Sequence, residues 1–179
     1  LKRDVANRRL QRLAKLPLLA QPGPEWNYSV PTDVLGALIE TISGMGFDRF
    51  LKTRIFDPLG MTDTGFTVRE DQRARFAANY QKAEGGGMTL IDAPNTSRYL
   101  KPRQLCSGGG GLVSTASDYL RFCKMIARKG ELYGARILGR KTVEERRSNY
   151  RQTGGDLASI GTLRLSVAAA GDAGSKRLF

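Results

Sequence analysis

One segment in the first third of the chain constrains the fold more strongly than any other feature of the sequence. It runs from Pro31 to Ser43, and its apolar residues recur at the spacing of a single helical face. These residues are Val34, Leu35, Leu38, Ile39 and Ile42. Ser29 or Thr32 can cap the start of this helix, and Gly44 suits a left-handed stop at its end. The segment therefore predicts a helix whose apolar face is stable only when another element covers it.

The rest of the chain predicts short helices mixed with short strands. Further helices are expected over residues 4–16, 47–55, 116–129 and 140–150. In the second of these, the residues expected to be buried are Phe47, Phe50, Leu51 and Ile55, and a turn follows at residues 57–60. Short strands are expected over residues 66–68, 77–81 and 88–91, with residues 85–87 as a hairpin loop. Thr115 is the expected N-cap of the helix that begins after it, with Asp118 at its third helical position and Gly130 at its end. The predicted class is α+β.

The absence of histidine limits the chemistry more than any residue that is present. The 179 residues include no histidine and two cysteines, which excludes a Ser-His-Asp triad, a Cys-His pair and any His-ligated metal. Two cysteines cannot form a four-cysteine zinc site either. We therefore expect no metal and no cofactor, and a hydrolytic reaction would need Tyr, Lys, Asp or Glu as its proton carrier. Cys123 lies in an apolar helical pattern, and Cys106 has no disulfide framework around it, so buried free thiols are favoured over a disulfide.

The formal net charge of +12 raises the possibility of a nucleic-acid or anionic-membrane partner. Much of that charge comes from two clusters. Residues 1–15 hold six basic side chains and one acidic one, and residues 140–151 hold five basic and two acidic ones. Such runs are typical of solvated helix faces, and neither cluster shows aromatic interleaving or a motif that enters a DNA groove. We expect no nucleic-acid partner, no membrane span and no signal peptide in residues 1–20, which slightly favours a cytoplasmic location.

The most specific motif lies immediately before the helix at Pro31–Ser43. Residues 22–30 have the sequence P-G-P-E-W-N-Y-S-V, in which a rigid turn is followed by Trp26, a packing residue on this pattern, and then by Tyr28 and Ser29. This order places the tyrosine at a junction between a loop and a helix. Taken alone, Tyr28 could equally be a buried aromatic residue at a helix start.

Three blocks of sequence, in order, resemble the family of class C β-lactamases and related penicillin-binding-protein-like esterases. The Tyr28-Ser29-Val30 stretch resembles the Tyr-x-Asn box of the β-lactamases, and is closer to the Tyr-Ser-Val of the esterases. Residues 55–64, I-F-D-P-L-G-M-T-D-T, are similar to a second block of the family. Residues 107–119, S-G-G-G-G-L-V-S-T-A-S-D-Y, resemble a third block, which is structural. The resemblance covers roughly residues 10–160. It implies a β-lactamase/transpeptidase-like fold, of which this chain would contain mostly the helical region and some short strands.

The resemblance also implies roles for the residues of the first block. In that family a serine in an S-x-x-K box attacks an ester or β-lactam carbonyl, and the lysine and a tyrosine handle its proton. Tyr28 would be the catalytic general acid/base, and Ser29 and Val30 would bind substrate. Val30 stands where β-lactamases have the Asn that contacts the substrate amide, which favours a small ester over a lactam.

The sequence departs from the family at its nucleophile. None of its ten serines has Lys three residues later, and Arg151 after Ser148 carries a guanidinium that stays protonated. The third family box, K-T-G, H-x-G or W-G-G, is also absent. We expect residues 1–162 to be the central portion of a serine hydrolase domain without its nucleophile and terminal strands, and residues 163–179 to be a divergent, poorly ordered tail. The chain alone should be inactive, with uncovered apolar helix faces.

Two other interpretations remain open at this point. The chain could be a noncatalytic β-lactamase-like binding module, or, with less support from its motifs, a basic nucleic-acid-binding domain. The glycine run at residues 108–111 lacks the Lys-Ser/Thr of a phosphate-binding loop, so a packing or turn role is favoured. Ser107 and Ser114 are disfavoured as independent nucleophiles, since no base lies near them in sequence. Oligomeric state and substrate identity stay open.

Overall fold

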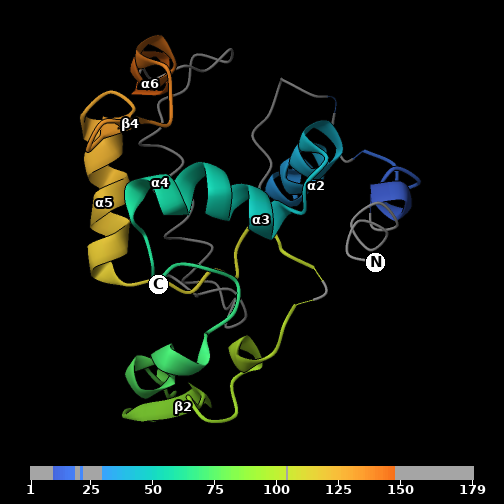
Figure 1. Ribbon diagram of the computed structural model, residues 1–179. Coiled ribbons are helices and arrows are strands. Elements are labelled where there is room, and N and C mark those ends of the chain that lie inside the picture. The colour runs from blue at the N-terminus through green and yellow to red at the C-terminus, as the bar shows by residue number, and fades with distance from the viewer. Residues whose placement is uncertain (1–9, 19–20, 22–29, 104, 148–179) are drawn as a thin grey trace.

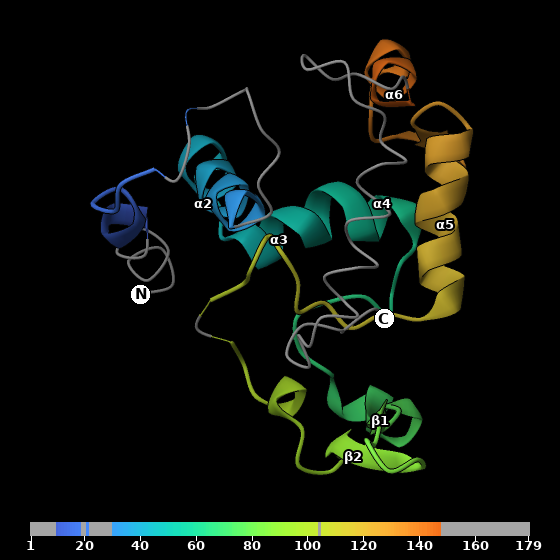
Figure 2. The same ribbon diagram turned by 180° about the vertical axis from the view of Figure 1, so that it is seen from behind.

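The computed structural model describes residues 10–18, 21, 30–103 and 105–147. These residues form mostly helices with two short β-hairpins, which confirms the predicted α+β composition. In chain order the elements are α2 (Pro31–Ser43), α3 (Phe47–Leu51), the π-helical turn η1 (Lys52–Phe56), α4 (Asp57–Leu59), the 3₁₀ helix η2 (Glu70–Arg75), β1 (Asn79–Lys82), β2 (Met88–Asp92), the 3₁₀ helix η3 (Arg98–Leu100), α5 (Ala116–Ala127), β3 (Glu131–Leu132), β4 (Ala135–Arg136) and α6 (Arg140–Arg147). Figures 1 and 2 show α2 and α5 at opposite ends of the α3–α4 segment, with the β1–β2 hairpin on one side of these helices.

Helix α2 has the predicted bounds, and Gly44 ends it in the left-handed conformation with φ of 70°. The residue that caps its start differs from the prediction. The N-cap is Val30, which supplies no side-chain hydrogen bond, and Thr32 lies inside the helix; Ser29 lies outside the described residues. Pro31 at the first helical position explains how the helix starts without a polar cap, because its fixed φ suits the helix and it has no N–H to satisfy.

The second helix is longer than the sequence predicts. It continues from α3 through the π-helical turn η1 into α4, and Gly60 ends it with φ of 65°. The expected turn at residues 57–60 is therefore the last turn of this helical segment. Phe47 is buried as expected, but the other buried positions are Phe56 and Leu59, while the predicted Phe50, Leu51 and Ile55 are only half-buried. The π turn adds one residue to the helical cycle, which shifts the buried face.

The main hydrophobic core lies where α4, α5 and the β3–β4 hairpin meet. Its buried members are Phe56, Leu59, Met61, Met125 and Leu132. Helix α5 begins as predicted, because Thr115 Oγ1 accepts the N–H of Asp118 at 3.2 Å. It ends at Ala127, and Lys129 and Gly130 then take positive φ values. The sequence did not predict the β3–β4 hairpin, whose strands have only two residues each.

The strand predictions were right for one hairpin and wrong for one segment. Strands β1 and β2 pair antiparallel around the predicted glycine loop. Residues 66–68 are not a strand; Gly65 forms a single bridge to Val113 instead, and Phe66 and Val68 are buried as irregular backbone. The apolar side chains of Phe66 and Val68, two residues apart, therefore pack into the interior, although their backbone does not form a strand.

The predicted first and last helices lie only partly within the described residues. Residues 10–13 are helical and residues 14–16 form turns, so the first helix ends earlier than predicted, and its residues 1–9 lie outside the described part. Helix α6 matches the last predicted helix up to Arg147; the residues beyond it, including the tail at 163–179, lie outside the described part. Both cysteines are thiols rather than disulfide partners, as predicted, but Cys123 is exposed and Cys106 half-buried, so their predicted burial was wrong.

Apolar helix faces are left uncovered within the described residues, as the sequence analysis anticipated. On α2 the exposed apolar side chains are Val34, Leu35, Leu38 and Ile42, of which Ile42 is 77% exposed. On α5, Tyr119 and Leu120 are also exposed. The apolar pattern of each helix thus exceeds the surface that its neighbours cover.

Candidate active site

The predicted site residues directly precede α2 in sequence. Tyr28 and Ser29 lie outside the described residues, so their roles stay predictions. Val30 is described, and its carbonyl oxygen accepts the N–H groups of Asp33 at 3.1 Å and Val34 at 3.2 Å. Its side chain is exposed. The start of α2 therefore sets the position of the residue that directly follows Tyr28 and Ser29.

The glycine run packs against the first two turns of α2. A Cβ on Gly108 would overlap the carbonyl oxygen of Thr32 and lie 2.8 Å from its carbonyl carbon and 3.3 Å from the amide nitrogen of Gly36. In the other direction, a Cβ on Gly36 would lie 3.4 Å from the amide nitrogen of Gly108. Only glycine at position 108 leaves room for this approach of two backbones. The predicted packing role of the run is confirmed here.

Ser107 and Asp33 join the same two elements by a hydrogen bond. The hydroxyl of Ser107 lies 2.5 Å from Asp33 Oδ1 and also accepts the N–H of Gly109 at 3.0 Å. Both side chains are half-buried. Asp33 was not among the predicted site residues, although an acidic residue in the first turn of a helix is a recognisable signal.

The second and third blocks of sequence meet through a separate set of bonds. Gly65 and Val113 exchange N–H···O bonds of 3.0 and 2.8 Å. Asp118 is buried, and its Oδ2 accepts the backbone N–H of Asp63 and the hydroxyl of Thr64, each at 2.8 Å. These contacts hold the end of the glycine run against the loop after α4, and they agree with a structural role for the third block.

Two carboxyl groups in and beside this region, those of Asp63 and Asp71, have lowered pKa values. Two N–H groups of Arg75, at 2.8 and 3.0 Å, and the amide of Gln72, at 3.1 Å, lower the pKa of Asp63 below its ordinary value. Hydrogen bonds from Arg69 likewise lower the pKa of the exposed Asp71. These side chains lie on η2 and the loop before it, so their ion pairs support the loop rather than the start of α2.

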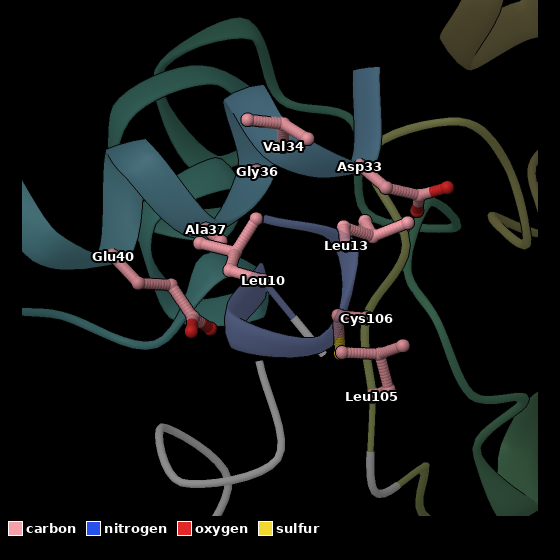
Figure 3. Close-up of a pocket in the computed structure, with 9 residues that line it drawn as sticks. All are labelled: Leu10, Leu13, Asp33, Val34, Gly36, Ala37, Glu40, Leu105 and Cys106. Atoms are coloured by element: carbon pink, nitrogen blue, oxygen red, sulfur yellow. The ribbon is translucent and has the colours of Figure 1, made fainter. Parts of the chain in front are cut away.

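A small pocket lies beside the glycine run, between residues 10–13, α2 and residues 105–106 (Figure 3). Most of the side chains that line it are apolar, and two are acidic. The lining residues are Leu10, Leu13, Asp33, Val34, Gly36, Ala37, Glu40, Leu105 and Cys106. The carboxylate of Glu40 is already used, because its Oε1 accepts the N–H of Phe47 at 2.8 Å. Asp33, whose carboxylate is bonded to Ser107, is therefore also one of the residues that line this largely apolar pocket.

Among the described residues, no group of three or more His, Cys, Asp or Glu side chains could hold a metal ion. No helix in this part of the chain is both long and apolar enough to cross a membrane.

Comparisons with known proteins agree with the three-block resemblance. The sequence profile of the family described as Beta-lactamase matches residues 2–173. The chain is 37% identical to Protein Rv1367c of Mycobacterium tuberculosis over 142 residues, which cover 78% of this chain and 34% of that protein. It is 35% identical to Esterase EstB of Burkholderia gladioli over 133 residues, which cover 65% of this chain and 33% of that protein.

A solved structure extends the comparison to the fold. The structure of EstCE1, a hydrolase with promiscuous acyltransferase activity, superposes with a TM-score of 0.65 at 27% identity, covering 77% of this chain and 38% of that one. The chain thus spans about a third of the length of the curated relatives named above.

Proposed function

The chain belongs to the beta-lactamase family, and from this premise we propose that it forms the central part of a serine hydrolase that works through an acyl-enzyme. Its fold is the mostly helical portion of a β-lactamase/transpeptidase-like fold, with short strands. The observation that carries the proposal is the Tyr28-Ser29-Val30 box, which leads directly into a helix packed on the glycine run of the third family block.

We assign the proton transfers of the reaction to Tyr28. In the proposed mechanism, a serine hydroxyl outside these 179 residues attacks the ester carbonyl while its proton passes to the Lys–Tyr28 pair. Tyr28 then returns a proton to the leaving alcohol, and water attacks the acyl-enzyme in the second half of the cycle. A tyrosine serves this purpose only when a nearby cation lowers its pKa from about 10, which is why the lysine of an S-x-x-K box belongs to the proposal.

We propose a small ester rather than a lactam as substrate. Val30 offers an exposed apolar side chain where an amide-binding Asn would stand, and an apolar side chain cannot hydrogen-bond a lactam amide. The names of two similar proteins support this choice: one is an esterase, and the other is a hydrolase with promiscuous acyltransferase activity. An alcohol could then replace water as the acceptor of the acyl group.

The experiment that tests this proposal has two arms. The 179-residue chain should not hydrolyse p-nitrophenyl butyrate or nitrocefin, and a fluorophosphonate probe should leave its intact mass unchanged, because no serine here has Lys three residues later. An adduct on any serine, Ser107 above all, would contradict the assignment. In a longer protein that holds this chain and an S-x-x-K box, Tyr28→Phe should lower kcat about 10²–10⁴-fold, whereas Tyr80→Phe on the exposed β1 strand should not change it.

The missing S-x-x-K pattern also supports a second candidate, a noncatalytic binding module of the same family. The two candidates differ in the coding sequence upstream of Leu1. An S-x-x-K box there favours the enzyme, and an uninterrupted reading frame without that box favours the binding module.

A further inference from the structure

The start of α2 lacks a side-chain cap of its own, and its acidic first-turn residue makes a distant contact instead. Val30 forms no capping bond with its side chain. A carboxylate at the position of Asp33 ordinarily interacts with the free N–H groups of its own helix. Here Asp33 Oδ1 lies 2.5 Å from the hydroxyl of Ser107, which is 74 residues away in sequence. The side chain that could stabilise the start of the helix locally therefore ties it to another segment.

That other segment has hydrogen bonds on both sides of its contact with α2, one within its own turn and two to a distant residue. Ser107 accepts the N–H of Gly109, which fixes the turn at the front of the glycine run. Behind the run, Val113 is bonded to Gly65 through two backbone hydrogen bonds. Between these points, the backbone at Gly108 lies so close to α2 that no side chain fits. The glycine run is thus tied to Gly65 at its far end and lies directly against the first turns of α2.

We propose that Asp33 and Ser107 are positioning residues: their hydrogen bond holds the first turn of α2 on the glycine run and thereby sets the position of Val30, where the segment that carries Tyr28 in sequence joins the helix. The inference rests on the proposed function, because the position of Tyr28 matters for the reaction only if its phenol carries the proton. Neither residue is assigned contact with substrate. Ser107 therefore acts as a hydrogen-bonding hydroxyl and not as a second nucleophile.

The only tryptophan of the chain, Trp26, precedes Tyr28 by two residues and serves as a local reporter. In the 179-residue chain, Ser107→Ala and Asp33→Ala should each change the acrylamide quenching constant of Trp26 about twofold, because each removes a charge-assisted hydrogen bond at the start of α2. Asp33→Asn keeps an acceptor oxygen for the Ser107 hydroxyl and should keep most of the wild-type value. The double variant should match Ser107→Ala, because without the Ser107 hydroxyl the Asp33 substitution removes no further bond between the two residues.

Ser43→Ala is the matched control. Ser43 lies at the other end of α2, where its hydroxyl donates to the carbonyl oxygen of Ile39 at 2.6 Å. The Ser43→Ala variant should leave the acrylamide quenching constant of Trp26 unchanged. Far-UV circular dichroism must show that each variant is folded; should Asp33→Ala unfold the chain, Ser107→Ala and Asp33→Asn carry the test.

The outcomes separate a positioning role from a purely stabilising one. If folded Ser107→Ala leaves the Trp26 signal unchanged, or if Ser43→Ala changes it equally, the pair does not position the segment and the inference is wrong. Additive effects in the double variant would also overturn it. A fluorophosphonate adduct on the chain would reject the proposed function instead, and this result does not depend on the fluorescence of Trp26.

Discussion

Helices α5 and α2 are both amphipathic in sequence, yet they are stabilised in different ways. On α5, Met125 is fully buried and packs into the core with Leu59 and Leu132. On α2 the buried residues are Gly36 and Ala37, while the larger Leu35 and Leu38 remain about half exposed. Burial of large apolar side chains therefore holds α5, whereas close backbone approach and one side-chain bond hold the start of α2. An apolar pattern identifies a helix but does not say what covers it.

The largest expected effect separates the two helices directly. Met125→Ala should lower the free energy of unfolding by about 2–5 kcal/mol, because it leaves a cavity in the core. Leu35→Ala on the exposed face of α2 should change the free energy of unfolding by no more than about 0.5 kcal/mol. Urea denaturation of both variants measures the difference. Equal losses would mean that the exposed face of α2 is covered in solution, and would contradict the difference between the two helices.

The second expected effect tests the backbone contact of α2. Gly108→Ala should destabilise the chain by about 1–3 kcal/mol, because the new Cβ overlaps the carbonyl group of Thr32. Gly110→Ala is the matched control, since a Cβ there meets no atom within 4 Å. It should be neutral or slightly stabilising. Similar denaturation midpoints for the two variants would show that the glycine run does not press on α2.

A third prediction concerns the polar contact of α5. Asp118→Ala leaves the N–H of Asp63 and the hydroxyl of Thr64 without their buried acceptor, at a cost of about 1–3 kcal/mol. Asp57→Ala removes only an exposed ion pair with Lys52 and should cost at most about 1 kcal/mol. Thermal melts of the two variants measure the difference between these two losses of stability. An equal loss would mean that the third block contributes no more than a surface pair.

The smallest expected effect depends on pH. The pKa of Asp63 is lower in the folded chain than its ordinary value of 3.8, so its ionised form stabilises the fold above that pH. This contribution is lost as the pH falls through the lowered pKa. Arg75→Gln removes its main cause and should make the acid side of the stability profile less steep. Arg54→Gln on η1 is the control, and a profile that it alters as much as Arg75→Gln would contradict the assignment.

Features set by neighbouring residues could be predicted from the sequence. The bounds of α2, the N-cap at Thr115 and the glycine loop of the β1–β2 hairpin all follow from side chains and turns within a few residues. The assignment of the family depended on three such local blocks. The roles of Tyr28, Ser29 and Val30 come from the same resemblance and remain to be tested.

Features that depend on distant partners could not be predicted. Residues 66–68 have the pattern of a strand, but the described part of the chain offers no second strand that pairs with them over their length, and they pack as irregular backbone. Cys123 follows the apolar period of α5 but faces away from the core. The short bond between Asp33 and Ser107 joins residues 74 positions apart, and no local pattern connects them.

The amino-acid sequence by itself determined where the helices α2 and α5 begin, which family the chain resembles, and that histidine chemistry is impossible in it. Those properties depend on composition and on interactions along a few neighbouring residues. Only the tertiary structure decided that α5 buries Met125 in the core while α2 leaves its larger apolar side chains exposed, and that a glycine run lies against the first turns of α2. Contacts of this kind depend on which distant backbones can approach closely, and that is a property of the folded chain.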